Sequence, residues 1–308
     1  MLPGLLWTLV TWTSSSLAES PGTLPGGAKV VYSGVGVTTF NRLTQNGEAV
    51  LRDREVRSRL DLYGSYGLTD RLQVSVSAPV VHSFVVDDPD ELPCPNLLSA
   101  EGYCETYLTV GQGRLDARYG VLRDKIPLTI GVAADVDVWN RARRGQYNSA
   151  GSGRTMLEGL AVVGAGTDAG GWRLDGLLFG AFGYSLAPDA TSADGRITVK
   201  APGDTVRGSL ELKGRRESLT FEVGGHYTQR LTGVDLDGQW VDDWFNSSLD
   251  RWNVLQYRGI AVSGKASLDL PNSSGLHLGV FRLVSVDNGA SNTTDVSIGW
   301  HRYFAPRS

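Results

Sequence analysis

The chain has 308 residues, of which 41% are hydrophobic and 20% are charged, a balance that allows a full core and excludes a disordered protein. Its formal net charge of -4 gives no reason to expect a nucleic-acid partner. The 39 glycines are spread along the chain, and no apolar run reaches the ~18 residues of a membrane-spanning helix.

The N-terminus has the composition of a secretory signal. An apolar core at 2–12 is followed by the residues SLA at 16–18, which fit a cleavage site of small residues before Glu19. No Lys or Arg precedes the apolar core, so a short membrane anchor is the alternative. We predict a signal peptide at 1–18 and a periplasmic linker at 19–27. This linker is too short for a plug domain, so any gate should come from interior side chains or an infolded loop.

Extended segments follow, and most of them alternate apolar and polar residues with a period of two, the pattern of a strand with two different faces. The clearest is 112–122, where Arg114 and Asp116 share one parity and Leu115 and Ala117 share the other. Twelve strands are expected at 28–40, 55–66, 72–82, 112–122, 127–139, 155–166, 172–185, 205–213, 218–231, 253–269, 275–285 and 293–304.

The connectors between these strands alternate strictly between short and long. This places tight turns at one end of the structure and long loops at the other, as in outer-membrane barrels, whose tight turns are periplasmic and whose loops are extracellular. The sequence therefore predicts an all-β, transmembrane, antiparallel up-and-down barrel at 28–304, followed by a tail at 305–308. The last strand must pair with the first, because an open edge in hydrocarbon leaves backbone groups unpaired. Short connectors are expected at 67–71, 123–126, 167–171, 214–217 and 271–275, and long ones at 41–54, 83–111, 140–154, 186–204, 232–252 and 286–292.

Aromatic residues indicate which face of the barrel meets lipid. With the apolar parity outside, they gather at both rims, as the two interfaces of a bilayer favour, whereas a soluble barrel has no reason to sort them so. The inward face of segment 28–40 stays undecided, because both of its parities are moderately apolar. The expected girdles are Tyr66, Tyr119, Trp172 and Trp300 near the tight turns, and Tyr184, Tyr227 and Trp252 near the loops.

The charged parity should then face an aqueous interior. Positive and negative residues nearly balance there, which predicts cross-strand ion pairs more than a ring of one sign. With Asp124 and Lys125 at a turn centre, Arg114 should lie opposite Asp135. Two interpretations stay open: a charged constriction that tunes permeation, or a salt-bridged wall that fills a narrow barrel. The expected lining residues are Arg57, Arg59, Asp61, Arg114, Asp116, Arg118, Asp135, Asp137, Glu158, Arg173, Asp175, Arg207, Glu211 and Lys265.

Two loops carry features of their own. Cys94 and Cys104 lie in one polar segment, and export of the chain would favour a disulfide between them. Without a nearby histidine they form a poor zinc site, and we expect neither a metal nor a cofactor. The segment 232–252 mixes tryptophans with aspartates. It could capture a ligand, bind a divalent cation, or be a solvated acidic loop whose aromatics pack on the rim.

Three runs resemble a known family: YGSYGLTDRLQVSVSAPVV at 63–81, GQGRLDARYGVL at 111–122 and PLTIGVAADVDV at 127–138. Together they are similar to the outer-membrane transporter-like barrels of the meta-pathway of phenol degradation. In that family a strand, a G-L-T-D turn, a strand ending in proline and a G-x-x-D-x-R strand recur. The resemblance covers 55–138 and implies passive passage of small molecules, apolar or aromatic compounds among them, with no catalytic residues. Unlike the usual terminal aromatic of such barrels, Phe304 lies four residues before the end of the chain.

Enzyme signatures are weak. The glycines at 164–166 lie on an expected strand, Ser152 lacks a G-x-S-x-G frame, and the four histidines are scattered. A barrel hydrolase would need a serine beside a histidine on the lipid-facing wall. We therefore expect a monomeric, non-enzymatic channel or transporter in outer-membrane lipid, with a small-molecule permeant. The alternative is a structural or adhesive barrel that is occluded by its own ion pairs and acts through its extracellular loops.

Overall fold

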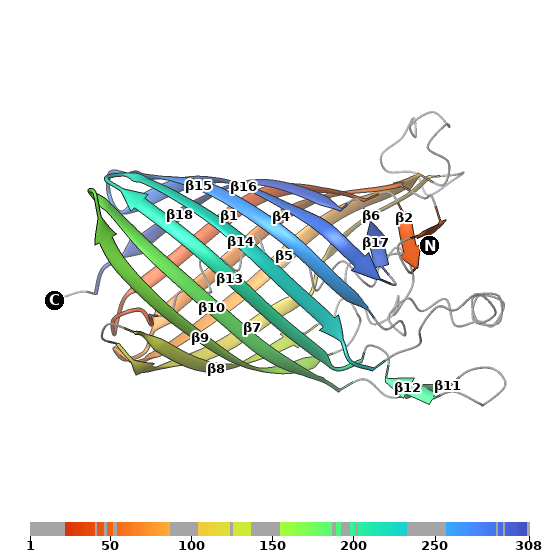
Figure 1. Cartoon of the computed structure of the whole chain (residues 1–308), viewed down its shortest axis with the longest axis horizontal. Coiled ribbons are helices and arrows are strands. Elements are labelled where there is room, and N and C mark those ends of the chain that lie inside the picture. Colours follow the sequence, from red (N-terminus) through yellow and green to blue (C-terminus); the bar gives the residue numbers. More distant parts are fainter. Residues whose placement is uncertain are drawn as a thin grey trace.

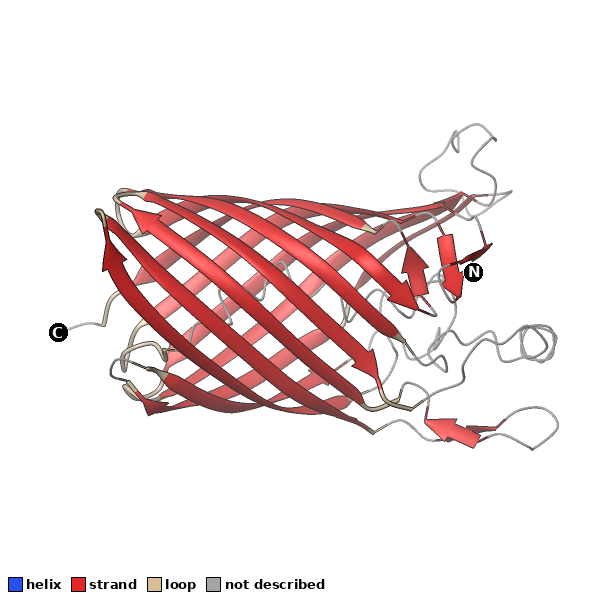
Figure 2. Ribbon diagram, viewed as in Figure 1, coloured by secondary structure: helices blue, strands red, loops and turns tan. Residues whose placement is uncertain are grey.

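A computed structural model of the chain describes residues 22–40, 42–45, 48–51, 54–86, 104–123, 126–136, 155–186, 189–191, 198–200, 203–232, 257–287, 289–291 and 293–306. The strands of this part of the chain form one closed cylinder and slant across its long axis (Figure 1 and Figure 2). No helix within the described ranges is long and apolar enough to cross a bilayer.

Thirteen strands of the main sheet occupy twelve positions around the cylinder, because β6 and β7 pair in succession with β5. The strand β1 pairs antiparallel with both β4 and β18, so the first and last strands close the ring and leave no edge. The predicted closed barrel of twelve strands is thus confirmed. Its strands are β1 (Lys29–Phe40), β4 (Arg54–Gly67), β5 (Leu72–Val86), β6 (Cys104–Val110), β7 (Gly113–Leu122), β8 (Leu128–Val136), β9 (Met156–Ala169), β10 (Trp172–Ser185), β13 (Thr205–Arg216), β14 (Leu219–Arg230), β15 (Arg258–Leu270), β16 (Ser274–Asp287) and β18 (Thr294–Phe304).

Tight turns gather at one end of the barrel, on the left of Figure 1, and the longer connections lie at the other end. Only Gly170 and Gly171 separate β9 from β10, with φ values of 58° and 81°. Glycine tolerates this left-handed backbone, and a turn of this hand matches the twist of the two strands. The strand β9 therefore continues to Ala169, beyond the predicted end at 166, and β13 continues to Arg216 rather than 213.

The prediction of one polar loop over 83–111 is wrong at both ends, since β5 continues to Val86 and β6 begins at Cys104. Ser77 faces Arg114 whereas Val80 faces Val110, so three steps along β5 are matched by four on its partner. This extra residue is a bulge opposite Pro79, and it interrupts the alternation that would have revealed β6.

Short strands also occur in other segments that we expected to be loops. At the loop end, β2 pairs with both β3 and β17 in a small sheet, and β11 pairs with β12. The barrel strand expected from 253 begins only at Arg258. The additional strands are β2 (Arg42–Gln45), β3 (Glu48–Leu51), β11 (Asp189–Thr191), β12 (Thr198–Lys200) and β17 (Gly289–Ser291).

Candidate channel lining

The two faces of the barrel wall differ as the alternation predicts. On β4 the side chains of Arg57 and Arg59 are buried, with 2% and 4% exposure, whereas Leu60 and Leu62 are 40% and 45% exposed. Because exposed apolar side chains recur along the strands while charged ones lie inside, the outer surface suits a hydrocarbon environment. The opposite choice, with the charged parity outside, does not occur.

The structure also decides the face of β1 that the sequence left open. Tyr32 and Thr38 are buried, with 2% and 0% exposure, and Val31 and Val35 are 45% and 53% exposed. Tyr32 and Thr38 therefore join the interior wall. Sequence reasoning missed them, because both parities of this strand carry valine and threonine, and its one charged residue, Lys29, lies on the outer parity.

The predicted lining residues mostly lie on the inner face. Arg173 is an exception to burial: it sits beside a tight turn, its side chain is 48% exposed, and it pairs with Asp168 and Asp175 at the mouth. Asp137 lies outside the described residues. Of the others, Arg57, Arg59, Asp61, Asp116, Arg118, Glu158, Arg207 and Glu211 are buried, and Arg114, Asp135, Asp175 and Lys265 are partly buried.

Around β1, one arginine joins three strands. Arg59 on β4 donates through Nε to Asp61 (2.6 Å) and through Nη1 and Nη2 to the carboxylate of Asp295 on β18 (2.5 and 3.0 Å). Thr38 on β1 donates to the same carboxylate at 2.5 Å. The side chains of Arg59 and Asp295 are 1% and 2% exposed, so the pair is shielded from solvent. We call this set the Arg59 network.

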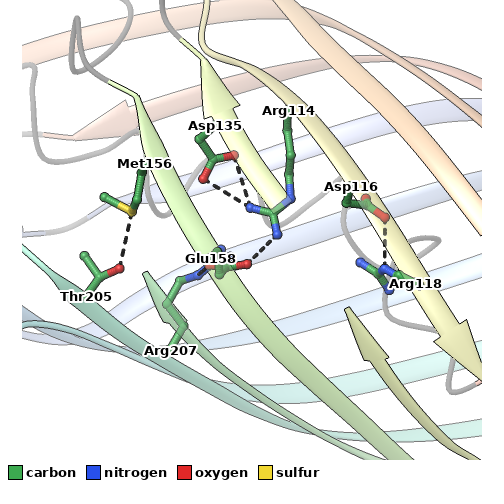
Figure 3. Close-up of polar contacts among 8 residues, drawn as sticks. All are labelled: Arg114, Asp116, Arg118, Asp135, Met156, Glu158, Thr205 and Arg207. Carbon is green, nitrogen blue, oxygen red and sulfur yellow. Dashed lines mark hydrogen bonds and ion pairs between the residues drawn. The ribbon is translucent and has the colours of Figure 1, made fainter. Parts of the chain in front are cut away.

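A second network lies along β7, β8, β9 and β13, and Figure 3 shows its members turned toward one another. Arg114 donates to both carboxylate oxygens of Asp135 at 3.1 Å, so the predicted cross-strand pair is confirmed. Glu158 accepts from Arg114 and from Arg207, and its side chain is 1% exposed. We call these four residues the Glu158 network. Each of its arginines faces at least one carboxylate, so the network carries little net charge.

Glycine on the strand between two partners allows an arginine to lie flat against the wall. Gly36 of β1 faces Arg59 on one side and Ser297 of β18 on the other. A Cβ at Gly36 would lie 3.1 Å from Nη2 of Arg59 and 3.2 Å from its Cζ. The absence of a side chain at this position therefore permits the guanidinium to reach Asp295 two strands away. Alternation alone does not reveal this requirement.

The interior also carries an apolar strip on β8, β9 and β10, made of Ala133, Leu160, Val162, Phe179 and Ala181. The first four are buried, with 0% to 6% exposure. They lie on the inner parity of the wall, which elsewhere carries charged side chains. The guanidinium of Arg207 lies 5.8 Å from the ring centre of Phe179, so the strip adjoins the Glu158 network. The interior is therefore not uniformly polar.

Two polar pairs involve histidine. His277 stacks on Tyr32, and its Nε2 lies 3.1 Å from the tyrosine hydroxyl. Ser263 Oγ lies 2.7 Å from Nε2 of His226, which is a serine beside a histidine, but both side chains belong to the inner wall. A lipid-facing hydrolase would need such a pair outside. A serine and a histidine alone also do not make an acyl-transfer site.

The part of the predicted linker that the structure describes is bound to the barrel by hydrogen bonds. Between 22 and 27 it lies across the inner face of the tight-turn mouth, where Leu24 N–H donates to Gln73 Oε1 (2.9 Å) and Thr23 accepts from Arg123 (3.0 Å). A Cβ at Gly67 would lie 2.1 Å from the carbonyl oxygen of Pro25. Gly67 is on the inner parity of β4, so the segment occupies the inside of the rim. Interior side chains and infolded loops are therefore not the only elements that could narrow the barrel.

Girdle residues expected from the sequence lie on the outer surface where the structure describes them. Tyr66, Tyr119, Tyr184 and Trp300 are 38%, 45%, 48% and 37% exposed, and Trp172 and Tyr227 are partly exposed. Trp252, Cys94, the side chain of Cys104, most of the acidic loop 232–252 and the signal segment 1–18 lie outside the described residues.

Neither a protein-family model nor a curated protein sequence matches this chain. Solved structures do: an outer-membrane channel from Pseudomonas putida F1 is 17% identical, with a TM-score of 0.63, over 92% of this chain and 98% of that one. The CymD monoaromatic hydrocarbon channel is 14% identical, with a TM-score of 0.43, over 94% and 92% of the two chains. The KdgM porin is 9% identical, with a TM-score of 0.44, over 90% and 99%. At 17% identity and a TM-score of 0.63, the likeness to the first of these establishes the outer-membrane barrel fold, and the resemblance noted in the sequence holds at that level.

Proposed function

We propose that this protein is a monomeric channel of the bacterial outer membrane for the passive passage of small uncharged molecules, apolar or aromatic compounds among them. The observation that carries the proposal is the composition of the inner wall, where charged side chains are bound to one another and an apolar strip lies beside them. Two of the similar structures are channels, and one of these is a channel for monoaromatic hydrocarbons.

Paired charges bear directly on the choice of permeant. A ring of one sign would attract counter-ions and reject like ions. In the Arg59 and Glu158 networks, each guanidinium already contacts one or two carboxylates, so an ion gains little from entering. The passage of an uncharged molecule does not depend on attraction to a charged side chain, and the apolar strip around Phe179 offers such a molecule a contact surface.

A second candidate is a structural or adhesive barrel that does not conduct. The burial of Arg57 and Arg59, at 2% and 4% exposure, favours it, because a wide water-filled bore would leave these side chains wetted. In that case the loops would carry the function.

Single-channel recording of the refolded chain in a planar bilayer tests the proposal, with a heat-modifiable gel shift to verify that the barrel is closed. We expect small conductance steps with a weak preference between cations and anions, and faster vesicle swelling with uncharged aromatic solutes than with charged solutes of equal size. A closed barrel that passes neither ions nor uncharged solutes would support the occluded barrel instead.

A further inference from the structure

Three cations stack on outward-facing aromatic rings at the tight-turn rim. The pairs are Lys29 with Tyr66, Arg216 with Trp172 and Arg302 with Phe304, at 5.6, 6.0 and 5.0 Å from cation to ring centre. Aromatic side chains of membrane proteins concentrate at the level of the lipid headgroups. Cations that stack on these rings are therefore held where lipid phosphates lie.

Arg216 differs from its neighbours at this rim. Arg215 pairs with Asp269, and Arg173 pairs with Asp168 and Asp175. Within the described part of the chain, Arg216 is in no ion pair, and it stacks on the ring of Trp172 of β10. Its charge is thus available on the outer wall.

An apolar hollow of about 580 Å³, within the ~300–1,000 Å³ range of ligand clefts, lies in the outer wall, and its lining residue Gly214 adjoins Trp172, the ring on which Arg216 stacks. It runs over β9, β10, β13 and β14, which lie side by side in Figure 1. Its lining is mostly apolar, with Leu174, Leu212, Phe221 and Val223 around Gly176 and Gly214, and it also includes Asp175, Lys213 and Glu222. A Cβ at Gly214 would lie 3.5 Å from the ring of Trp172 and 3.6 Å from Leu174, so a larger side chain there would fill the hollow.

We propose that this part of the outer wall is a binding site for one acidic phospholipid. An acyl chain would lie in the hollow, where it covers apolar side chains, and the phosphate would accept hydrogen bonds from the guanidinium of Arg216, whose planar fork suits phosphate oxygens. The site lies at the tight-turn end, which is the periplasmic end in barrels of this type, and the periplasmic leaflet of the outer membrane consists of phospholipid. The inference rests on the membrane placement in the proposed function, but not on conduction.

Native mass spectrometry of the full chain tests the site, after reconstitution with equal amounts of phosphatidylglycerol and phosphatidylcholine. We expect one retained phosphatidylglycerol per chain. The substitution Arg216→Gln should lower this retention about fivefold, the factor that one interfacial arginine contributes. Gly214→Leu should lower the retention of both lipids, because it fills the hollow. The matched control is Arg302→Gln, which removes a cation from the same rim outside the hollow and should leave retention unchanged.

Three outcomes would contradict the proposed lipid site. They are equal retention of the two lipids by the unaltered chain, equal losses of lipid retention in Arg216→Gln and Arg302→Gln, or a dimer that dissociates when Gly214 is replaced by Leu. The last result would assign the hollow to a second copy of the chain. Conductance separates this test from that of the proposed function, because Arg216 lies on the outer wall. A chain that retains the lipid but conducts nothing would refute the channel and leave the lipid site standing.

Discussion

Replacing Glu158 by Gln should destabilise the barrel and make its interior more positive. The carboxylate of Glu158 is 1% exposed and binds both Arg114 and Arg207. After the change Arg114 keeps Asp135, but Arg207 keeps no ion pair with any described residue, although its contact with the ring of Phe179 remains. Removing one partner of a buried pair costs about 3–5 kcal/mol, and we expect the lower end, ~3 kcal/mol, because one arginine stays paired and the amide can still accept a hydrogen bond.

Urea unfolding followed by the heat-modifiable gel shift measures this loss. The matched control is Asp269→Asn, since Asp269 and its partner Arg215 have side chains that are 38% and 56% exposed, and such a surface pair contributes about 0–1 kcal/mol. In a salt gradient, the reversal potential of Glu158→Gln should also shift in the direction of greater anion selectivity, because the interior has lost one negative charge. Equal losses of stability in the two variants would refute the reasoning, as would an unchanged reversal potential in a conducting barrel.

Two further substitutions test how glycines shape the interior. Gly36→Val should displace the guanidinium of Arg59 from the barrel wall and so lower the single-channel conductance. The control is Gly180→Val, which should leave the conductance unchanged because an added Cβ at Gly180 has open space. Equal conductances in these two variants would contradict the role assigned to Gly36. Gly67→Ala should raise the conductance, because its Cβ would lie 2.1 Å from the oxygen of Pro25 and displace the segment 22–27 from the mouth; no rise would mean that the segment does not limit conduction.

Alternation along the strands predicted most of the charged residues that face the interior. In an extended chain successive side chains point to opposite faces, so Arg57, Arg59 and Asp61 had to share a side with one another and not with Leu60. The strict alternation of short and long connectors likewise predicted an even number of strands, and the cost of an open edge in hydrocarbon required a closed ring. These are local properties, repeated strand by strand. Only β1, without a charged residue to mark its inner parity, remained undecided.

Contacts between strands had to come from the tertiary structure. The register of one turn placed Arg114 opposite Asp135, but the reach of Arg59 across Gly36 to Asp295 depends on three strands lying side by side. The bulge opposite Pro79 interrupted the alternation and concealed β6. The position of the segment 22–27 in the mouth likewise depends on surfaces that form only when the barrel closes. The sequence by itself therefore determined the barrel and the orientation of its wall, because side-chain direction is a property of each strand. Which groups neutralise one another inside was decided only by the tertiary structure, because that depends on distances between strands far apart in the chain.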